Sequence, residues 1–279
     1  YELPGATAAY VLPDGRMETF ATGFADLENS IRMNPQARML AASIGKTFVG
    51  AVAVTLVEEG LLCLDDPVST WIGDKPWFSR LANHDSITLR HLLTHHAGIK
   101  DHIHTKQFMR AFAKHKGAKQ PFSPKDLIGF ILDRPALFAA GENWHYSDTG
   151  YILIGLIIKS VTQTPYYDVL TQRFLQPLHL DLTTPSNRRT LPGLVPGYTA
   201  ADNAFGLPEK STIRPGVMAW HPGIEWTGGG LVSNSGDLAV WAKALYSGDA
   251  LSEGARELLL QSVAVSSDTP DIRYGMGTA

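Results

Sequence analysis

The sequence is poor in cysteine and in long apolar runs. Cys63 is the single cysteine among 279 residues, which excludes an internal disulfide and a metal site built from several thiolates. It lies in the apolar run from Leu61 to Leu64, so we expect a buried structural thiol rather than a nucleophile. The longest apolar stretches, 48–57 and 151–158, fall well short of the roughly 20 residues that a membrane-spanning helix requires. We therefore expect no membrane span.

Charged residues are scarce and nearly balanced. Asp, Glu, Lys and Arg make up 18% of the chain, against about 25% in typical globular proteins. The formal net charge is −3, whereas a nucleic-acid-binding protein would show a basic excess. The hydrophobic content of 44% is ordinary for a globular protein and excludes disorder for most of the chain. The composition therefore indicates a packed protein that does not bind nucleic acid.

The apolar pattern predicts strands at both ends of the chain and helices between them. Residues 6–12 and 17–23 are typical of two strands joined by the turn signal Pro13-Asp14-Gly15. Residues 43–60 and 149–161 predict helices that are apolar on nearly every face, as buried central helices are. Further helices are expected at 87–93, 125–132, 166–174, 236–246 and 253–262, and the expected helix caps are Ser43, Thr88, Ser123, Ser235 and Ser252. This order favours one sheet-bearing unit interrupted by a helical insertion.

The clearest chemical signal is Ser43-Ile44-Gly45-Lys46 at the start of the first buried helix. Positions i and i+3 share a helical face, so the hydroxyl of Ser43 and the amine of Lys46 can touch. A serine becomes a nucleophile when a neighbour takes its proton, and a desolvated lysine can do this. Free N–H groups at a helix N-terminus also suit an oxyanion. The alternative is a plain capping serine with a first-turn lysine, although a lysine there opposes the helix dipole.

A second signal, Tyr146-Ser147-Asp148, stands directly before the second buried helix. A tyrosine near a lysine can relay a proton to a leaving group. Asp148 or its neighbour can hydrogen-bond a substrate amide or ester. The alternative is that Ser147 or Asp148 simply caps the helix, which still leaves Tyr146 at the mouth of the loop.

Together the two motifs resemble the serine β-lactamase and penicillin-binding-protein superfamily. The best match is its class C-like branch, with DD-carboxypeptidases, class C β-lactamases, related esterases and D-amino-acid peptidases. The resemblance runs along almost the whole chain. It is carried by Ala25-Asp26-Leu27, Val57–Leu61 with Leu64–Pro67, Ile87–His95, Tyr146–Gly155, Pro177-Leu178, Gly229–Ser233 with Asp237-Leu238, and Tyr274–Gly277.

The resemblance implies an α+β fold (an α/β sandwich) of the β-lactamase/transpeptidase-like type. An antiparallel sheet flanked by helices would lie beside an all-α subdomain, with the site in the cleft between them. We expect one domain over 1–279, its sheet-bearing part at about 1–64 and 216–279 and its all-α part at about 65–215. The resemblance alone also suggests a periplasmic or extracellular location. Oligomeric state is left open.

The resemblance also implies roles for the site residues. Ser43 would be the acylated nucleophile, and Lys46 and Tyr146 would share the general acid/base work, with the identity of the base left open. No cofactor is needed. The substrate would be a small molecule or peptide: a D-amino-acid peptide, a β-lactam or a small ester. The alternative is a catalytically silent homologue that only binds peptidoglycan or penicillin-like ligands.

Asp148 stands where most relatives place asparagine, as a substrate-binding residue. An asparagine offers a donor and an acceptor to a substrate amide, whereas an ionised aspartate only accepts. A carboxylate near Lys46 would also hold the lysine charged and weaken it as a base. The departure argues against β-lactam or D-Ala-D-Ala recognition and favours esterase or other peptidase chemistry.

Two other kinds of site are weighed against this one. Five histidines fall between His91 and His104, and His91 and His95 have the i, i+4 spacing of a zinc helix. No glutamate lies between them, and the resemblance explains both as structural, so we expect no metal. Residues 41–45 also approach the G-x-S-x-G elbow of α/β-hydrolases. That fold needs alternating strands and helices after the serine, and this chain predicts helix and loop instead.

The resemblance further implies a third motif, Lys-Thr-Gly or His-x-Gly, on a strand that supplies the second oxyanion N–H. In relatives it follows the Tyr-Gly-x-Gly segment, here Tyr274–Gly277, by some twenty residues. His221-Pro222-Gly223 has a proline where that strand must donate an N–H, and Trp226-Thr227-Gly228 runs directly into the glycine segment. We therefore expect either that the gene product continues past Ala279 or that a second, C-terminal fragment supplies these strands.

Overall fold

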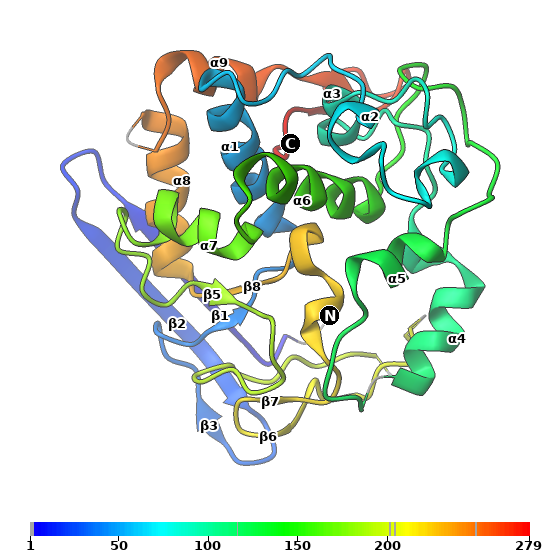
Figure 1. The fold of residues 1–279 in the computed structure, drawn as a ribbon. Helices are drawn as coiled ribbons and strands as arrows, with labels where there is room; N and C mark the ends of the chain where they lie inside the picture. Colours follow the sequence, from blue (N-terminus) through cyan, green and yellow to red (C-terminus); the bar gives the residue numbers. More distant parts are fainter. Residues whose placement is uncertain (1–2, 116, 201, 204, 249) are drawn as a thin grey trace.

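The computed structural model describes residues 3–115, 117–200, 202–203, 205–248 and 250–279 (Figure 1). It combines helices with small antiparallel sheets, which confirms the predicted α+β class. The helices are α1 (Gly45–Glu58), α2 (Ser69–Ile72), α3 (Leu89–Leu93), α4 (Lys106–His115), α5 (Pro124–Gly129), α6 (Asp148–Thr162), α7 (Tyr166–Leu170), α8 (Ser235–Ser247) and α9 (Glu253–Leu260). The strands are β1 (Gly5–Val11), β2 (Met17–Asp26), β3 (Ile31–Arg32), β4 (Met39–Leu40), β5 (Thr184–Pro185), β6 (Thr212–Arg214), β7 (Val217–Met218), β8 (Leu231–Ser233), β9 (Val263–Ala264) and β10 (Arg273–Tyr274).

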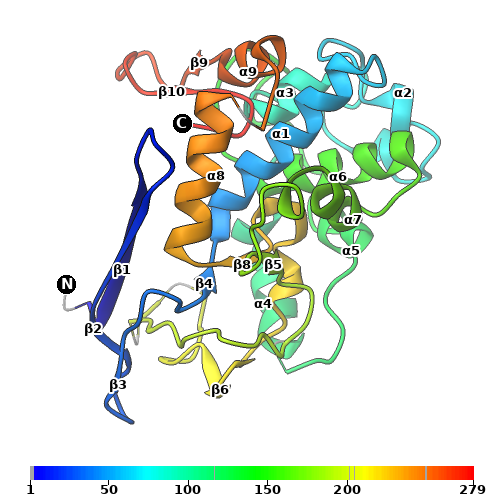
Figure 2. The same ribbon diagram turned by 90° about the vertical axis from the view of Figure 1, so that its left-hand side faces the viewer.

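The predicted hairpin is confirmed. β1 and β2 pair antiparallel in continuous register from Gly5 opposite Gly23 to Val11 opposite Met17. The turn between them places Gly15 at a φ of 89°, which favours glycine. β3 adds to the outer edge of β2 after a bulge, and helix α8 packs against β1 (Figure 2).

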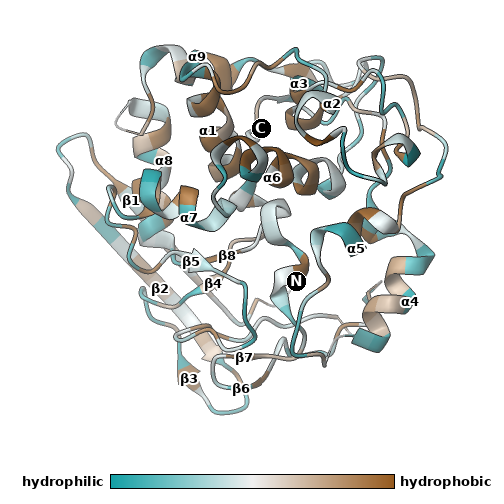
Figure 3. Cartoon of the chain, in the orientation of Figure 1, coloured by the Kyte–Doolittle hydropathy of each residue, from teal (hydrophilic) through white to brown (hydrophobic). Residues whose placement is uncertain are grey.

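The two helices predicted to be buried form the centre of the molecule. α1 and α6 consist mostly of apolar residues (Figure 3), and they pack against each other. On the α8 side, the ring of Phe48 stacks on Trp241 with centroids 4.0 Å apart. On the opposite side, a β-carbon at Gly50 would overlap the backbone carbonyl of Met276. The segment around Met276 therefore lies directly on α1, and glycine is required where they meet.

Several helix starts follow the predicted capping. Thr88, Ser123 and Ser252 each accept a hydrogen bond from a backbone N–H in the first turn of α3, α5 and α9. Two predicted caps are wrong. The cap of α8 is Asn234 rather than Ser235, because the asparagine side chain accepts from the N–H of Asp237. Ser43 does not cap α1, because a 3₁₀ turn, Ala42–Ile44, precedes the helix and the N-cap position falls on Ile44.

A short central sheet connects distant parts of the chain. β8 pairs with β4 on one side and β5 on the other, both antiparallel. β4 leads into the turn that carries Ser43, and β8 follows the glycine segment 228–230, so the sheet brings these two segments together. β5 and β6 fall inside the range 65–215 for which an all-helical subdomain is expected, and the subdomain boundaries stay a prediction.

The prediction for Cys63 is wrong. Its neighbours Leu62 and Leu64 are 5% and 3% exposed, whereas the thiol of Cys63 is free and exposed to solvent. The two leucines turn inward at alternate positions, so the residue between them faces outward. Among the described residues, no helix combines the length and apolarity needed to cross a membrane.

Candidate active site

Ser43 lies on the turn Ala42–Ile44 between β4 and α1, which we call the Ser43 turn. Ala42 has a φ of 46°, in the left-handed region that L side chains rarely adopt. Such strain costs about 1–3 kcal/mol and persists where the surrounding structure enforces it. Here the backbone of Gly229 lies against the turn, since a β-carbon on Gly229 would fall 2.5 Å from the Ala42 carbonyl oxygen. The Ser43 turn and the glycine segment are thus packed backbone to backbone.

The side chains of Tyr146 and Lys46 both reach the hydroxyl of Ser43. Ser43 Oγ lies 2.6 Å from the hydroxyl oxygen of Tyr146 and 3.2 Å from Lys46 Nζ. Lys46 is one helical turn along α1, whereas Tyr146 comes from the loop that enters α6. Within the described chain the amide N–H of Ser43 has no hydrogen-bond partner, so it is available to a carbonyl oxygen placed above the hydroxyl.

Lys46 is completely buried, and its ammonium is surrounded by acceptors. Nζ donates to Asp148 Oδ1 at 2.5 Å and to the backbone carbonyl of Gly228, in addition to Ser43. Burial alone would lower the pKa of Lys46, but the charges of Asp148 and then of Tyr146 outweigh it, and the pKa is raised. Lys46 is therefore an ammonium at neutral pH. Asp148 and Gly228 hold it in place.

A buried histidine packs against the ring of Tyr146. The ring of His95 lies 4.3 Å from that of Tyr146, centroid to centroid, and the backbone N–H of Ser147 donates to His95 Nδ1 at 3.2 Å. Because Nδ1 accepts, the ring proton is on Nε2. Burial, and then the charge of Lys46, hold the pKa of His95 well below its usual value. His95 is therefore neutral and acts as a fixed platform for Tyr146 and Ser147.

A second buried carboxyl lies beneath Asp148. Asp101 is 3% exposed, and its Oδ1 accepts the backbone N–H of Ile103 at 3.3 Å. Burial, followed by the nearby charge of Asp148, raises the pKa of Asp101 to about 7. Its neighbour His102 bonds through Nδ1 to Thr149 Oγ1 at 3.0 Å, and burial lowers the pKa of His102 to about 4. The N-terminus of α6, and with it Asp148, is thus anchored by buried polar groups.

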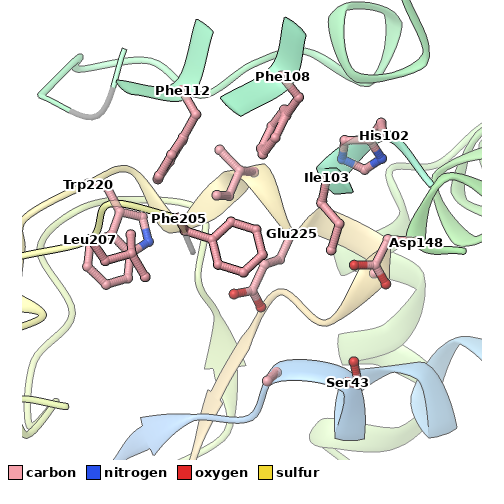
Figure 4. Close-up of a pocket in the computed structure, with 13 residues that line it drawn as sticks. Ser43, His102, Ile103, Phe108, Phe112, Asp148, Phe205, Leu207, Trp220 and Glu225 are labelled. Atoms are coloured by element: carbon pink, nitrogen blue, oxygen red, sulfur yellow. The ribbon is translucent and has the colours of Figure 1, made fainter. Parts of the chain in front are cut away.

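Ser43 and Asp148 open onto a cavity of about 270 Å³ (Figure 4). Its far wall is apolar and largely aromatic, drawn from α4, from the segment before β6, and from the segment after β7. The lining residues are Ala42, Ser43, His102, Ile103, Phe108, Phe112, Asp148, Phe205, Leu207, Trp220, Ile224, Glu225 and Gly228. An apolar group of moderate size therefore fits beside the Ser43 hydroxyl.

Sequence reasoning missed two residues of this site, Gly228 and Glu225. Both lie between β7 and β8: Gly228 ends the 3₁₀ turn Trp226–Gly228, and Glu225 joins this turn to the preceding one, Pro222–Ile224. Neither turn is a strand, in agreement with the exclusion of both triplets as the third motif. For Gly228 the glycine segment itself is a usable signal, since three successive glycines indicate that another segment approaches the backbone closely. Nothing in the local pattern distinguishes Glu225 from a surface glutamate.

The other histidines of the cluster are engaged in local structure. His91 Nδ1 accepts from the backbone N–H of Thr88 at the start of α3. His96 Nδ1 lies 3.0 Å from the carbonyl oxygen of Thr94. Over the described ranges, the structure contains no group of three or more His, Cys, Asp or Glu side chains arranged to hold a metal ion.

The structure brings all four sequence-predicted site residues together. Ser43, Lys46, Tyr146 and Asp148 form one chain of contacts at the mouth of the cavity. In the described part of the chain, no histidine contacts the Ser43 hydroxyl, and no alternating strand–helix pattern follows it. An α/β-hydrolase elbow is therefore excluded. Ser147 occupies the N-cap position of α6, as one form of the capping alternative expects, but its side chain makes no capping hydrogen bond.

Comparison with known proteins identifies the family of this chain. The family model named Beta-lactamase matches residues 1–278. Penicillin-binding protein 4* of Bacillus subtilis (strain 168) is 25% identical over 264 residues, which cover 91% of this chain and 55% of that protein. The chain thus spans about half the length of this relative. A D-stereospecific amidohydrolase from Streptomyces sp. superposes with a TM-score of 0.82 at 29% identity, covering 98% of this chain and 77% of that one.

A penicillin-binding protein homologue from Pyrococcus abyssi, described as octameric, matches with a TM-score of 0.76 at 25% identity. It covers 98% of this chain and 60% of the homologue. These likenesses agree with the observed fold. The chain belongs to the Beta-lactamase family, within the serine β-lactamase and penicillin-binding-protein superfamily of serine hydrolases.

Proposed function

We propose that this protein hydrolyses small amides and esters through an acyl-enzyme on Ser43. The observation that carries the proposal is the convergence of Tyr146 and Lys46 on the Ser43 hydroxyl, at the mouth of an apolar cavity. A hydroxyl bonded by a phenol and an ammonium has no structural purpose on an exposed turn. It is the arrangement that an activated nucleophile needs.

Tyr146 is the general base in this proposal, and Lys46 is its electrostatic support. Lys46 is already protonated, so it cannot accept a proton from Ser43. Its charge attracts the phenolate form of Tyr146, whose oxygen lies 2.6 Å from Ser43 Oγ. The phenolate takes the Ser43 proton while Oγ bonds to the substrate carbonyl carbon. The Ser43 amide N–H donates to the oxyanion.

The second half of the reaction returns the enzyme to its starting state. When the oxyanion collapses, the bond to the amine or alcohol breaks, and Tyr146 gives that leaving group its proton. A water molecule then attacks the Ser43 ester and transfers a proton to Tyr146. Collapse of the second oxyanion releases the carboxylic acid. Ser43 recovers its hydroxyl proton from Tyr146.

The charges at the site favour neutral or cationic substrates over anionic ones. Asp148 and Glu225 both line the cavity, and among the described lining residues there is no lysine or arginine. Penicillins and peptides ending in D-alanine carry a carboxylate, which these side chains repel. Amides and esters without that carboxylate fit better. The likeness to a D-stereospecific amidohydrolase favours D-configured amides among them.

Steady-state hydrolysis tests the proposal. We expect turnover of p-nitrophenyl butyrate and of D-alanine p-nitroanilide, and slower turnover of a chromogenic cephalosporin. Ser43→Ala must abolish all of it, whereas Ser86→Ala, on an exposed serine far along the chain, must not. Binding without turnover would instead show a silent homologue, in which the Lys46–Asp148 ion pair locks the site. Turnover that survives Ser43→Ala would refute the acyl-enzyme.

A further inference from the structure

Glu225 contributes a carboxyl group to the cavity wall. It lies between two 3₁₀ turns, Pro222–Ile224 and Trp226–Gly228, and its side chain points into the cavity between Phe205 and Asp148 (Figure 4). Its Oε2 atom is shut off from solvent and accepts no hydrogen bond from any described residue. Leaving a buried carboxyl oxygen without a hydrogen-bond donor is costly, so a ligand that supplies a donor to Oε2 gains affinity.

Among the described residues, no cation is free to pair with Glu225. Asp148, from α6, adds a second negative charge, and Lys46, from α1, is the cation that acts on Glu225. The ammonium of Lys46 is already engaged by Asp148 and the Gly228 carbonyl. Tyr167, from α7, is a neutral phenol whose hydroxyl donates to Gly230, and His102 is neutral. Burial and then the charge of Asp148 raise the pKa of Glu225 to about 7.

The rest of the cavity wall favours an apolar ligand rather than a cation. Phe108, Phe112, Phe205 and Trp220 provide aromatic surface beside the carboxyl. A neutral hydrocarbon would fill this space but leave Glu225 unpaired. A small hydrophilic cation would pair with Glu225 but would make no favourable contact with the apolar wall. A ligand with an apolar body and a protonated amine satisfies both, and the aromatic rings also attract the cation.

We propose that Glu225 determines specificity by receiving the protonated primary amine of the substrate. The substrate class is then an amide or ester of an amino acid with a free α-amine and an apolar or aromatic side chain. The reaction step rests on the proposed function, whereas the recognition of the amine does not. The acyl group would place its amine at Glu225 and its carbonyl at Ser43, both of which line the same cavity.

Calorimetric binding of two matched probes tests this without any turnover. 2-Phenylethylammonium and 2-phenylethanol have the same ring and chain length, and they differ in charge. We expect the unmodified protein to bind the ammonium about 10- to 100-fold more tightly, the range of a hydrogen bond to a charged group. Glu225→Gln, which has nearly the same shape, must reduce this preference to within about threefold. Glu257→Gln, on an exposed glutamate of α9, must leave it unchanged.

The pH dependence provides a second readout. An alkylammonium stays charged below about pH 9. Ammonium affinity must therefore rise with pH through about 7 as Glu225 ionises, while affinity for the alcohol stays flat. Equal affinity for the two probes, or a preference that survives Glu225→Gln, overturns the inference. The outcomes also distinguish this inference from the proposed function. Amine binding without turnover contradicts only the proposed function. Ester turnover without a preference for the amine contradicts only the role of Glu225.

Discussion

Replacing Asp148 by asparagine removes the anion that faces Lys46 at 2.5 Å. Lys46 is fully buried, and the side chain of Asp148 is 20% exposed, so the pair is only weakly screened. At an effective dielectric constant of 20, unit charges at this distance attract by roughly 6–7 kcal/mol, before the cost of desolvation is subtracted. Breaking a buried pair costs about 3–5 kcal/mol of the free energy of unfolding. This is a ceiling, because Lys46 can respond by releasing its proton.

The loss of stability expected in Asp148→Asn depends on pH. In the native protein the folded pKa of Lys46 is raised above its ordinary value of 10.5, so the ion pair stabilises the fold below pH 10.5, and this stabilisation is lost as pH rises through the folded pKa. In Asp148→Asn, burial acts without its counter-ion and lowers the pKa of Lys46. The destabilisation is therefore largest below the lowered pKa of Lys46 in the variant, shrinks as pH rises through that pKa, and is lost above the folded pKa of the native protein. Thermal unfolding at pH 7 and pH 11 measures this, at about 2–4 °C per kcal/mol.

The same substitution alters substrate choice. The new amide donates a hydrogen bond into the cavity, and one of the charges that repel anionic substrates is gone. We expect acylation by a penicillin to improve by about tenfold relative to a p-nitrophenyl ester, equivalent to 1.4 kcal/mol. Asp168→Asn makes the same change in the exposed first turn of α7 and must alter neither quantity. An unchanged Tm and an unchanged ratio in Asp148→Asn would refute the assigned coupling to Lys46.

Three further outcomes follow from single contacts. Lys46→Ala should slow acylation by a fluorophosphonate about 10²- to 10⁴-fold with the fold kept, and labelling at the parental rate would exclude the Ser–Lys arrangement. Gly229→Ala should cost about 1–3 kcal/mol of the free energy of unfolding, because its β-carbon meets the Ala42 carbonyl at 2.5 Å, and chemical denaturation measures this. Gly129→Ala, where a β-carbon meets nothing within 4 Å, should instead be neutral or stabilising. Cys63 is exposed, so the native protein should release one equivalent of thionitrobenzoate from Ellman's reagent without denaturant, and a thiol that reacts only after unfolding would contradict its exposure.

Much of the fold is local enough to predict from sequence. The hairpin around Gly15 follows from its turn residues, and the apolar helices α1 and α6 follow from the spacing of apolar residues. Both features are local in the sequence. The contact of Ser43 with Lys46 follows in the same way from i, i+3 spacing. Cys63 was misassigned because an apolar run does not say which of its residues faces outward.

The rest of the site depends on contacts between distant segments. The Ser43–Tyr146 contact joins residues 103 positions apart, and the sequence supports it only through a family resemblance. Gly228 lies on a 3₁₀ turn and Glu225 lies between two such turns, and these turns are too short to give a periodic signal. Their place beside Lys46 is created by the backbone contact of Gly229 with the Ser43 turn. Side-chain chemistry of this kind becomes visible only after tertiary packing is known.

Covalent labelling tests the central claim most directly. The folded protein is treated with a fluorophosphonate, digested, and the modified residue identified by mass spectrometry. The account predicts one adduct, on Ser43, that is absent from Ser43→Ala and from protein unfolded before treatment. An adduct on any other residue, or a natively folded protein that takes up no label, would contradict it.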